Sequence, residues 1–311
     1  MGLGCWAIGG PFWDRGGWMG YGAVDDAESR RALARALELG VTLLDTASVY
    51  GCGHSESLIG EVIAGRREQV VIVDKIGYAF DVAKREVIGP DPSPAGIRAS
   101  CESTLSRLRT DYVDILQLHL FDLPIEQTLE VQSVLDSLVR EGKIRHHGWC
   151  SEDPEATARF AEGSPHASLT TVLLNVLEGD ARSLAVADRF DLGVTVRRPL
   201  CMGLLTGTLD ASTKLAPNDM RVRFGWNLQS GKQAAQLTKL GRIAEVLRTG
   251  GRTLAQGAIG WLWARHPRLV PVPGFKSVAQ VEENAGALRF GALPESAMRE
   301  IDALLGHSPR L

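Results

Sequence analysis

Residues 70–120 read VVIVDKIGYAFDVAKREVIGPDPSPAGIRASCESTLSRLRTDYVDILQLHL, and this stretch decides the fold. Its two ends, Val70–Val73 and Tyr112–Leu118, are short and mostly apolar, as in strands buried on both faces. Between them, Ser93–Arg109 opens with Ser-Pro and places leucines on one face, which predicts a helix. A strand, a crossover helix and a second strand predict two parallel neighbours in one sheet.

The same alternation continues along the whole chain. Short β-branched or apolar runs recur eight times, and longer helical patterns separate most of them. The expected strands are Leu3–Ile8, Val41–Leu44, Val70–Val73, Tyr112–Leu118, Lys143–Trp149, Leu169–Leu174, Val194–Val196 and Leu269–Val272. The expected helices are Asp25–Leu39, Ser93–Arg109, Ile125–Arg140, Pro154–Ala161, Asp180–Asp188, Gln233–Arg248, Thr253–Arg265, Ser277–Leu288 and Ser296–Leu305.

Eight such units in 311 residues predict a single (β/α)8 TIM barrel, an α/β fold. The competing fold, a doubly wound sheet, would carry G-x-G-x-x-G between its first strand and first helix. Gly2-x-Gly4 lies too early, and Gly9-Gly10 is followed by Pro11, so no such fingerprint is present. No linker or low-complexity segment interrupts residues 1–311, which are expected to form one domain. The stretch Gly203–Ser230, rich in Gly, Thr, Pro and Asn, is expected to form a long loop over one barrel end.

Composition and charge exclude several classes of protein. The chain is 44% hydrophobic and 23% charged, with a formal net charge of −3, so it is globular and has no basic excess for nucleic acid or a membrane surface. No apolar run approaches the ~18 residues of a membrane span, and the N-terminus lacks the basic start of a signal peptide. Five cysteines without a CxxC pair predict neither a disulfide framework nor a zinc ribbon, and the histidines lack partners for a metal. We therefore expect a reduced, cytoplasmic protein without a metal.

Four ionisable residues follow three consecutive predicted strands. Asp45 and Tyr50 come after the second strand in LLDTASVYG, Lys75 comes after the third in VVIVDKIGY, and His119 ends the fourth in LQLHLFD. In a TIM barrel the active site lies at the carboxyl ends of the strands, so these side chains can converge on one point.

Their chemistry is coherent. A lysine ammonium about 4 Å from a tyrosine hydroxyl lowers the pKa of that hydroxyl from its ordinary value near 10, by up to roughly 3. A carboxylate such as Asp45 holds the lysine charged and in place. A histidine orients a carbonyl oxygen or shares its proton. Together these groups favour protonation of an oxygen that becomes an alkoxide while hydride reaches the carbon.

The chain resembles the aldo-keto reductase family. The stretch Gly40–Gly60 (GVTLLDTASVYGCGHSESLIG) closely matches the most recognisable motif of that family, and the contexts of Lys75 and His119 match the next two. The closing stretch Val270–Leu288 (VPVPGFKSVAQVEENAGAL) resembles the motif that binds the cofactor adenosine. The resemblance covers nearly the whole chain and implies a barrel that binds NADP(H) without a Rossmann fold.

The resemblance also implies roles for single residues. Tyr50 is the proton donor, Lys75 its pKa-lowering partner, Asp45 the counter-ion of Lys75, and His119 the residue that orients the carbonyl. Lys276 stands where the family often meets the 2′-phosphate, and Glu283 and Asn284 stand where it meets adenine. The full set implied to bind the cofactor is Cys150, Ser151, Thr171, Arg197, Pro199, Leu200, Gly203, Gly274, Phe275, Lys276, Gln280, Glu283 and Asn284.

The chain departs from the family pattern at several places. The family begins with a hairpin that plugs the barrel bottom, whereas this chain starts almost directly at its first strand. The nicotinamide clamp, commonly Ser-Asn and Gln, reads Cys150-Ser151 and Thr171 here. Arg197 replaces the aromatic residue that stacks on nicotinamide, and Gln280 replaces a residue that is often basic. A modest preference for NADPH over NADH follows.

The sequence therefore predicts an enzyme, an NADP(H)-dependent reductase or dehydrogenase acting on a small carbonyl or alcohol substrate, either an aldehyde, a ketone or a sugar-like molecule. Aromatic residues in the expected rim loops favour a ring-bearing or sugar-like substrate. The alternative is a non-catalytic, cofactor-binding regulatory subunit of the same fold. A metal hydrolase on the same barrel is disfavoured because metal ligands do not cluster. The plain structural interpretations are that Lys276 is a surface lysine, Cys150 a buried filler and Arg197 one half of a rim ion pair.

Overall fold

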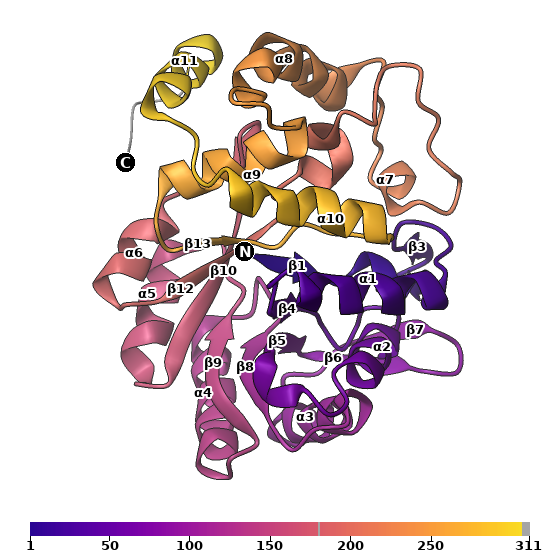
Figure 1. Ribbon diagram of the computed structural model, residues 1–311. Coiled ribbons are helices and arrows are strands. Elements are labelled where there is room, and N and C mark those ends of the chain that lie inside the picture. Colours follow the sequence, from indigo (N-terminus) through magenta and orange to yellow (C-terminus); the bar gives the residue numbers. More distant parts are fainter. Residues whose placement is uncertain (180, 307–311) are drawn as a thin grey trace.

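A computed structural model describes residues 1–179 and 181–306, and strands alternate with helices along it (Figure 1). Eight parallel strands pair in the order β1, β4, β5, β8, β9, β10, β12 and β13. A parallel bridge between Gly4 and Gly274 joins the first strand to the chain just beyond the last one, so the sheet is nearly closed. The helices lie between successive strands and outside the sheet, which confirms the predicted TIM barrel.

All eight predicted strands are present. The first differs most, because it ends at Gly4 and Ala7–Gly9 form a 3-10 turn where a strand was expected. Met1, just before β1, packs against the hydrophobic residues of both halves of the barrel. The strand bounds are β1 Gly2–Gly4, β4 Leu43–Asp45, β5 Val71–Ile76, β8 Val113–Leu118, β9 Ile144–Trp149, β10 Ala167–Asn175, β12 Gly193–Arg197 and β13 Leu269–Pro271; a two-residue strand, β11 (Glu178–Gly179), pairs with β10.

Each predicted helix has a counterpart in the structure, and two further helices occur in its described part. α2 (His54–Val62) and the single turn α7 (Met220–Arg223) were not predicted. The predicted helix Asp180–Asp188 begins at Ser183, and its first residue lies outside the described part of the chain. The other bounds are α1 Asp26–Glu38, α3 Pro94–Leu108, α4 Ile125–Arg140, α5 Pro154–Gly163, α6 Ser183–Arg189, α8 Gly231–Leu247, α9 Leu254–Arg265, α10 Val278–Gly286 and α11 Glu295–Leu305.

Side-chain caps fix where several helices begin. The Asp25 carboxylate accepts hydrogen bonds from two backbone N–H groups of the first turn of α1, and Ser93 caps α3 in the same way. α9 begins with a reciprocal capping box between Thr253 and Gln256. These caps satisfy N–H groups that would otherwise lack partners, so the loops before the helices leave the barrel at defined points.

A second, smaller sheet lies over one end of the barrel. Its strands β2 (Phe12–Asp14), β3 (Gly17–Met19), β6 (Tyr78–Asp81) and β7 (Glu86–Pro90) come from the loops that follow β1 and β5. The loop before α8 reaches it, because Met220 N–H donates to the carbonyl of Gly20 and α7 contacts β3 (Figure 1). The segment Gly203–Ser230 thus covers this end of the barrel, as predicted, with the short helix α7 inside it.

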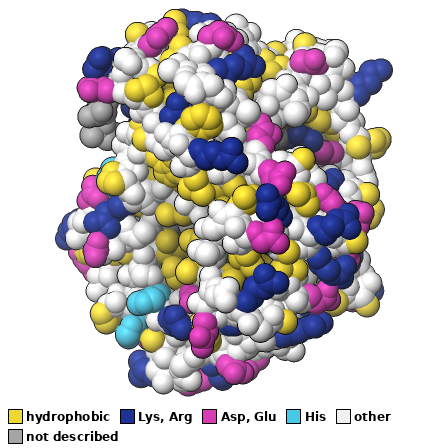
Figure 2. Space-filling model, in the orientation of Figure 1, with side chains coloured by type: hydrophobic (Ala, Val, Ile, Leu, Met, Phe, Trp, Pro, Cys, Tyr) yellow, Lys and Arg dark blue, Asp and Glu magenta, His cyan; other side chains and the backbone are white. Residues whose placement is uncertain are grey.

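The molecular surface carries both signs of charge. On the face shown in Figure 2, Lys and Arg side chains alternate with Asp and Glu, and apolar side chains are exposed between them. Among residues 1–179 and 181–306, no helix has the length and apolar character needed to cross a membrane.

Candidate active site

The barrel brings the four predicted catalytic residues together. Asp45 ends β4, Lys75 lies near the end of β5, and His119 follows β8; these three strands are neighbours in the sheet. The Lys75 Nζ donates hydrogen bonds to Asp45 Oδ1 at 2.6 Å and to the backbone carbonyl of Thr46 at 2.7 Å. Lys75 and Asp45 are both buried, and the ammonium lies 5.6 Å from the centre of the Tyr50 ring. A buried ion pair therefore lies beneath the tyrosine, as predicted.

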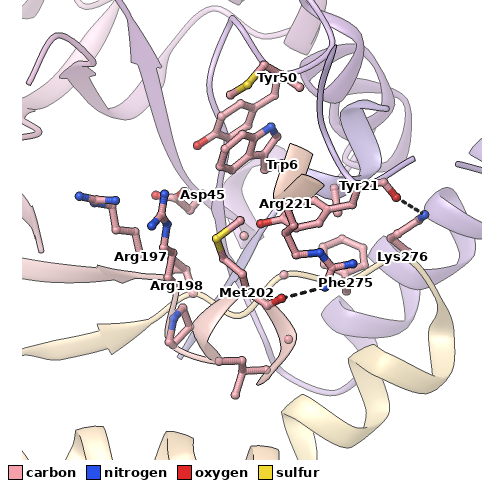
Figure 3. Close-up of a pocket in the computed structure, with 18 of the residues that line it drawn as sticks. Trp6, Tyr21, Asp45, Tyr50, Arg197, Arg198, Met202, Arg221, Phe275 and Lys276 are labelled. Atoms are coloured by element: carbon pink, nitrogen blue, oxygen red, sulfur yellow. Dashed lines mark hydrogen bonds between the residues drawn. The ribbon is translucent and has the colours of Figure 1, made fainter. Parts of the chain in front are cut away.

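Aromatic rings fix the orientation of Tyr50. The Trp6 ring lies parallel to the Tyr50 ring, with centroids 5.4 Å apart and an angle of 7° between the planes (Figure 3). The imidazole of His119 lies 6.0 Å from Tyr50 and 6.1 Å from Tyr78, edge-on to both. Phe121 closes the other side of the imidazole at 5.6 Å. The tyrosine hydroxyl and the imidazole therefore share one wall lined by rings.

The backbone around Tyr50 depends on two glycines in contact. A Cβ on Gly51, where φ is +63°, would lie 2.0 Å from the carbonyl oxygen of Gly9. A Cβ on Gly9 would in turn lie 2.8 Å from the carbonyl group of Tyr50. Only glycine fits both positions, so the turn after β1 presses directly on the backbone that carries the tyrosine.

Burial controls the ionisation of the site. Burial raises the pKa of Tyr50 above its ordinary value of 10, and this effect outweighs the charge of Lys75, which lowers it. The sequence predicted a net lowering, and that prediction was wrong. Burial lowers the pKa of Lys75, but Asp45, Tyr50 and Cys150 together outweigh this effect, so the net shift is upward and Lys75 is charged. Burial, with Lys75 and Arg197, lowers the pKa of His119 to about 3, so its imidazole is neutral.

The four residues lie at one end of a cavity of about 590 Å³. This volume is within the usual range for sites that bind small molecules and cofactors. Asp45, Tyr50 and His119 line the cavity, whereas Lys75 lies behind them. Of the residues implied to bind the cofactor, those lining it are Arg197, Pro199, Leu200, Gly203, Gly274, Phe275, Lys276, Gln280, Glu283 and Asn284.

The clamp positions Cys150, Ser151 and Thr171 are not among the residues that line this cavity. The Thr171 hydroxyl interacts with Thr195 at 2.7 Å and donates to Gln117 at 3.1 Å, and the Cys150 thiol also faces Gln117. The Ser151 hydroxyl pairs with the backbone of Asp153, and Ser151 lines a separate small cavity. The predicted cofactor contacts of these three side chains therefore find no support in the geometry.

Arg197 leaves the end of β12 and forms an ion pair with Glu152, while its guanidinium lies 5.0 Å from the Phe121 ring centre. Burial and the neighbouring Arg198 lower the pKa of Arg197 to about 10, which leaves it charged at neutral pH. The structure thus contains the ion pair of the plain interpretation, and the Arg197 side chain also lines the cavity.

Lys276 is half buried and lies across the cavity from Asp45 in Figure 3. Its Nζ donates to the backbone carbonyl of Tyr21 at 2.9 Å (Figure 3) and to that of Ala23 at 2.7 Å. Burial lowers the pKa of Lys276, and Asp219 partly offsets this effect. Lys276 therefore stays at the cavity wall, where its ammonium ties the loop after β3 to the chain beyond β13.

The cavity contains residues that the sequence prediction did not include: Trp6, Tyr21, Arg198 and Arg221. Trp6 lies just past β1. The rule that the active site of a TIM barrel lies at the carboxyl ends of its strands, which predicted Asp45, therefore also applies to Trp6. Arg221 lies in the long loop, where it pairs with Asp219 and donates to the Met202 carbonyl at 3.0 Å. Nothing in the sequence near Arg221 indicates that contact.

Several buried polar atoms at this cavity lack a hydrogen-bond partner: Trp6 Nε1, Asp45 Oδ2, His119 Nδ1 and Arg197 Nε. Unpaired buried donors and acceptors are costly, and their gathering around one cavity indicates a polar ligand. The cationic side chains along the same cavity suit a ligand with phosphate groups. The residues present therefore fit a phosphorylated dinucleotide. In the described part of the chain, no three His, Cys, Asp or Glu residues gather as metal ligands.

These features define a TIM barrel with a polar, cation-lined cavity at one end, and comparisons with known proteins identify its family. The aldo/keto reductase family model matches residues 1–305. The chain belongs to the aldo/keto reductase family.

Relatives agree over nearly the full length. Aldo-keto reductase YhdN of Bacillus subtilis (strain 168) is 29% identical over 288 residues, covering 91% of this chain and 82% of that protein. The solved structure of glycerol dehydrogenase AKR11B4 from Gluconobacter oxydans has a TM-score of 0.81 and 28% identity, covering 99% of this chain and 92% of that one. An aldo-keto reductase from Klebsiella pneumoniae in complex with NADPH has a TM-score of 0.71 and 26% identity, covering 100% of this chain and 92% of that one.

Proposed function

We propose that this protein uses NADP(H) to interconvert a small carbonyl compound and its alcohol, with Tyr50 as the proton donor. The observation that carries the proposal is the buried Asp45–Lys75 pair beneath Tyr50 and beside His119, at one end of the large cavity. The cofactor is supported by the unpaired polar atoms and cations of the cavity, and by the relative from Klebsiella pneumoniae that is solved in complex with NADPH.

NADPH, when bound, supplies the hydride for the carbonyl carbon. The carbonyl oxygen accepts a hydrogen bond from the Tyr50 hydroxyl, and the neutral imidazole of His119 orients it. As the oxygen gains negative charge, Tyr50 transfers its proton to it, which completes the alcohol. The Lys75 ammonium stabilises the resulting tyrosinate, and Asp45 keeps that ammonium in position. The transfer remains favourable although the pKa of Tyr50 is raised, because an alkoxide is a much stronger base than a tyrosinate.

The catalytic end of the cavity favours a substrate with an apolar or ring-bearing body. Phe12, Val49, Tyr78, Val87 and Phe121 line the cavity together with the catalytic residues. Such side chains favour flat or apolar groups by contact area and exclude water from the reacting carbonyl.

The proposal is tested by mixing the protein with NADPH and a panel of aryl aldehydes, aliphatic aldehydes, ketones and sugars while NADPH absorbance is followed. The corresponding alcohols are tested with NADP⁺. We expect consumption of NADPH with at least one carbonyl class. Tight cofactor binding without turnover in either direction would instead support the regulatory-subunit alternative.

The pH dependence should differ between the two directions. In reduction, Tyr50 must be protonated and His119 neutral, and both conditions hold between about pH 5 and 9, since the pKa of Tyr50 is raised and that of His119 is about 3. We expect a flat rate of reduction over that range in single-turnover experiments. Oxidation needs the tyrosinate, so its rate should rise about tenfold per pH unit below the pKa of Tyr50. A break in the reduction profile near pH 6.5 would mean that His119 titrates and would contradict this assignment.

Arg197 and Glu152 should tune the relative affinity for the two redox states, because oxidised nicotinamide carries a positive charge. With the ion pair intact, the charge of Arg197 is offset. Glu152→Gln exposes it, and a like-charge contact costs about 1 kcal/mol when partly solvated, or about fivefold. We expect Glu152→Gln to raise the ratio of the NADP⁺ to the NADPH dissociation constant about fivefold.

Adding Arg197→Gln to that variant should restore the original ratio. Fluorescence titration of both cofactors measures it, and Trp6 in the cavity wall is a suitable reporter. An unchanged ratio in Glu152→Gln would show that Arg197 acts only as a structural residue.

A further inference from the structure

The cationic side chains of the cavity differ in whether they have partners. The cations lining the cavity are Arg15, Arg197, Arg198, Arg221 and Lys276. Four of them pair with a carboxylate or with backbone carbonyls. Within residues 1–179 and 181–306, no hydrogen bond or ion pair reaches the guanidinium of Arg198. A half-buried guanidinium without a partner favours the binding of an anion at that place.

The backbone turns Arg198 away from its neighbour. Its φ is +56°, a left-handed conformation that a side-chain-bearing residue adopts at a cost of about 1–2 kcal/mol. The Asn175 side chain holds the turn by donating to the Arg198 carbonyl at 3.0 Å. Arg197 therefore lies on the Glu152 side of the turn, while Arg198 extends into the cavity next to Met202 (Figure 3).

Arg198 lines the cavity together with residues of both of its ends. On one side it adjoins Arg197, whose charge also acts on His119. On the other side its charge acts on Tyr21, whose ring also faces Arg221 and whose carbonyl accepts from Lys276. A dinucleotide whose reactive ring lies by His119 and whose adenosine lies by Lys276 has its diphosphate between the two.

We propose that Arg198 binds the diphosphate of the dinucleotide cofactor; this inference rests on the proposed function. The diphosphate is common to NADH and NADPH, so Arg198 contributes equally to both affinities. Only a contact to the 2′-phosphate, for which Lys276 is the candidate, distinguishes them. Arg198 thus supplies affinity and Lys276 supplies selectivity.

The experiment compares Arg198→Gln with Lys276→Met by fluorescence titration of four probes: NADPH, NADH, ADP-ribose and 2′-AMP. ADP-ribose has the diphosphate without the 2′-phosphate, and 2′-AMP has the reverse. We expect Arg198→Gln to weaken NADPH, NADH and ADP-ribose by about tenfold, as for loss of one charge-assisted hydrogen bond, and to leave 2′-AMP unchanged. Lys276→Met should weaken NADPH and 2′-AMP only.

Two further variants keep the test independent of folding. Arg198→Gly removes the side chain and suits the left-handed backbone, so it should reproduce Arg198→Gln. Arg198→Lys retains the charge and should recover part of the affinity. The proposal is overturned if Arg198→Gln and Arg198→Gly bind all four probes like the native protein, or if they weaken only NADPH and 2′-AMP. If the native protein binds none of the dinucleotides, the proposed function itself fails.

Discussion

Tyr50→Phe should lower turnover by roughly 10²–10⁴, the usual contribution of a positioned acid, while the fold and the cofactor affinity stay nearly unchanged. Phenylalanine keeps the ring that stacks on Trp6, with centroids 5.4 Å apart, and loses only the hydroxyl group. The buried Lys75 keeps both of its hydrogen bonds, because neither goes to Tyr50. The loss should therefore appear in the chemical step, which single-turnover reduction of an aldehyde by prebound NADPH measures.

Tyr78→Phe is the matched control for this experiment. Tyr78 lines the same cavity, and its ring lies edge-on to that of His119. The two ring centroids are 6.1 Å apart, nearly the same as the 6.0 Å between Tyr50 and His119. The hydrogen bonds of Lys75 go to Asp45 and Thr46, and the ammonium faces Tyr50. We expect less than a tenfold loss in Tyr78→Phe. If Tyr50→Phe also loses less than tenfold under conditions where chemistry limits the rate, Tyr50 is not the proton donor.

The barrel could be predicted because its strands are buried on both faces. Runs such as Val194–Val196 are β-branched at every position and fully buried, which few other structures require. The small sheet could not be predicted in this way, because its strands are short, lie half exposed and pair across loops far apart in sequence, such as Trp13 with Glu86. α2 was missed for a related reason: it begins with His-Ser-Glu-Ser and contains Gly60, so its apolar stripe is short.

The catalytic residues could be predicted because one topological rule places strand ends together. The rule predicts where residues lie but not how strongly they interact. This limit explains the error about the pKa of Tyr50. A sequence shows that Lys75 is near, whereas the opposing effect of burial depends on Trp6 and on the packing of Gly9 against Gly51. The same limit applies to Arg197 and Arg198. They are adjacent in sequence, yet the left-handed backbone conformation of Arg198 gives the two side chains different surroundings.

Beneath the catalytic loop, Arg107→Met should destabilise the fold by about 3–5 kcal/mol, because it leaves a buried carboxylate uncompensated. Glu56 lies on α2, just after the loop of Tyr50, and its side chain is 0% exposed. Its carboxylate accepts from Arg107 Nε at 2.5 Å and from the Thr104 hydroxyl at 2.7 Å. The buried carboxyl of Asp74 lies next to it, and burial and the Glu56 charge raise the pKa of Asp74. Asp74 cannot replace the cation.

Arg98→Met is the control, since Arg98 lies on the same helix, α3, and its ion pair with Glu141 is 41% and 37% exposed. A surface pair of this kind contributes about 0–1 kcal/mol. Urea unfolding monitored by circular dichroism measures both variants. Adding Glu56→Gln to Arg107→Met removes the uncompensated charge and should recover part of the loss. Equal unfolding free energies for Arg98→Met and Arg107→Met would contradict the argument.

The other possible source of the loss is packing, because the Arg107 guanidinium lies 5.5 Å from the centre of the Phe80 ring. Adding Glu56→Gln to Arg107→Met removes the buried charge and leaves any loss of that packing in place. A double variant as unstable as Arg107→Met would therefore mean that the loss comes from packing and that the charge of Glu56 does not cause it.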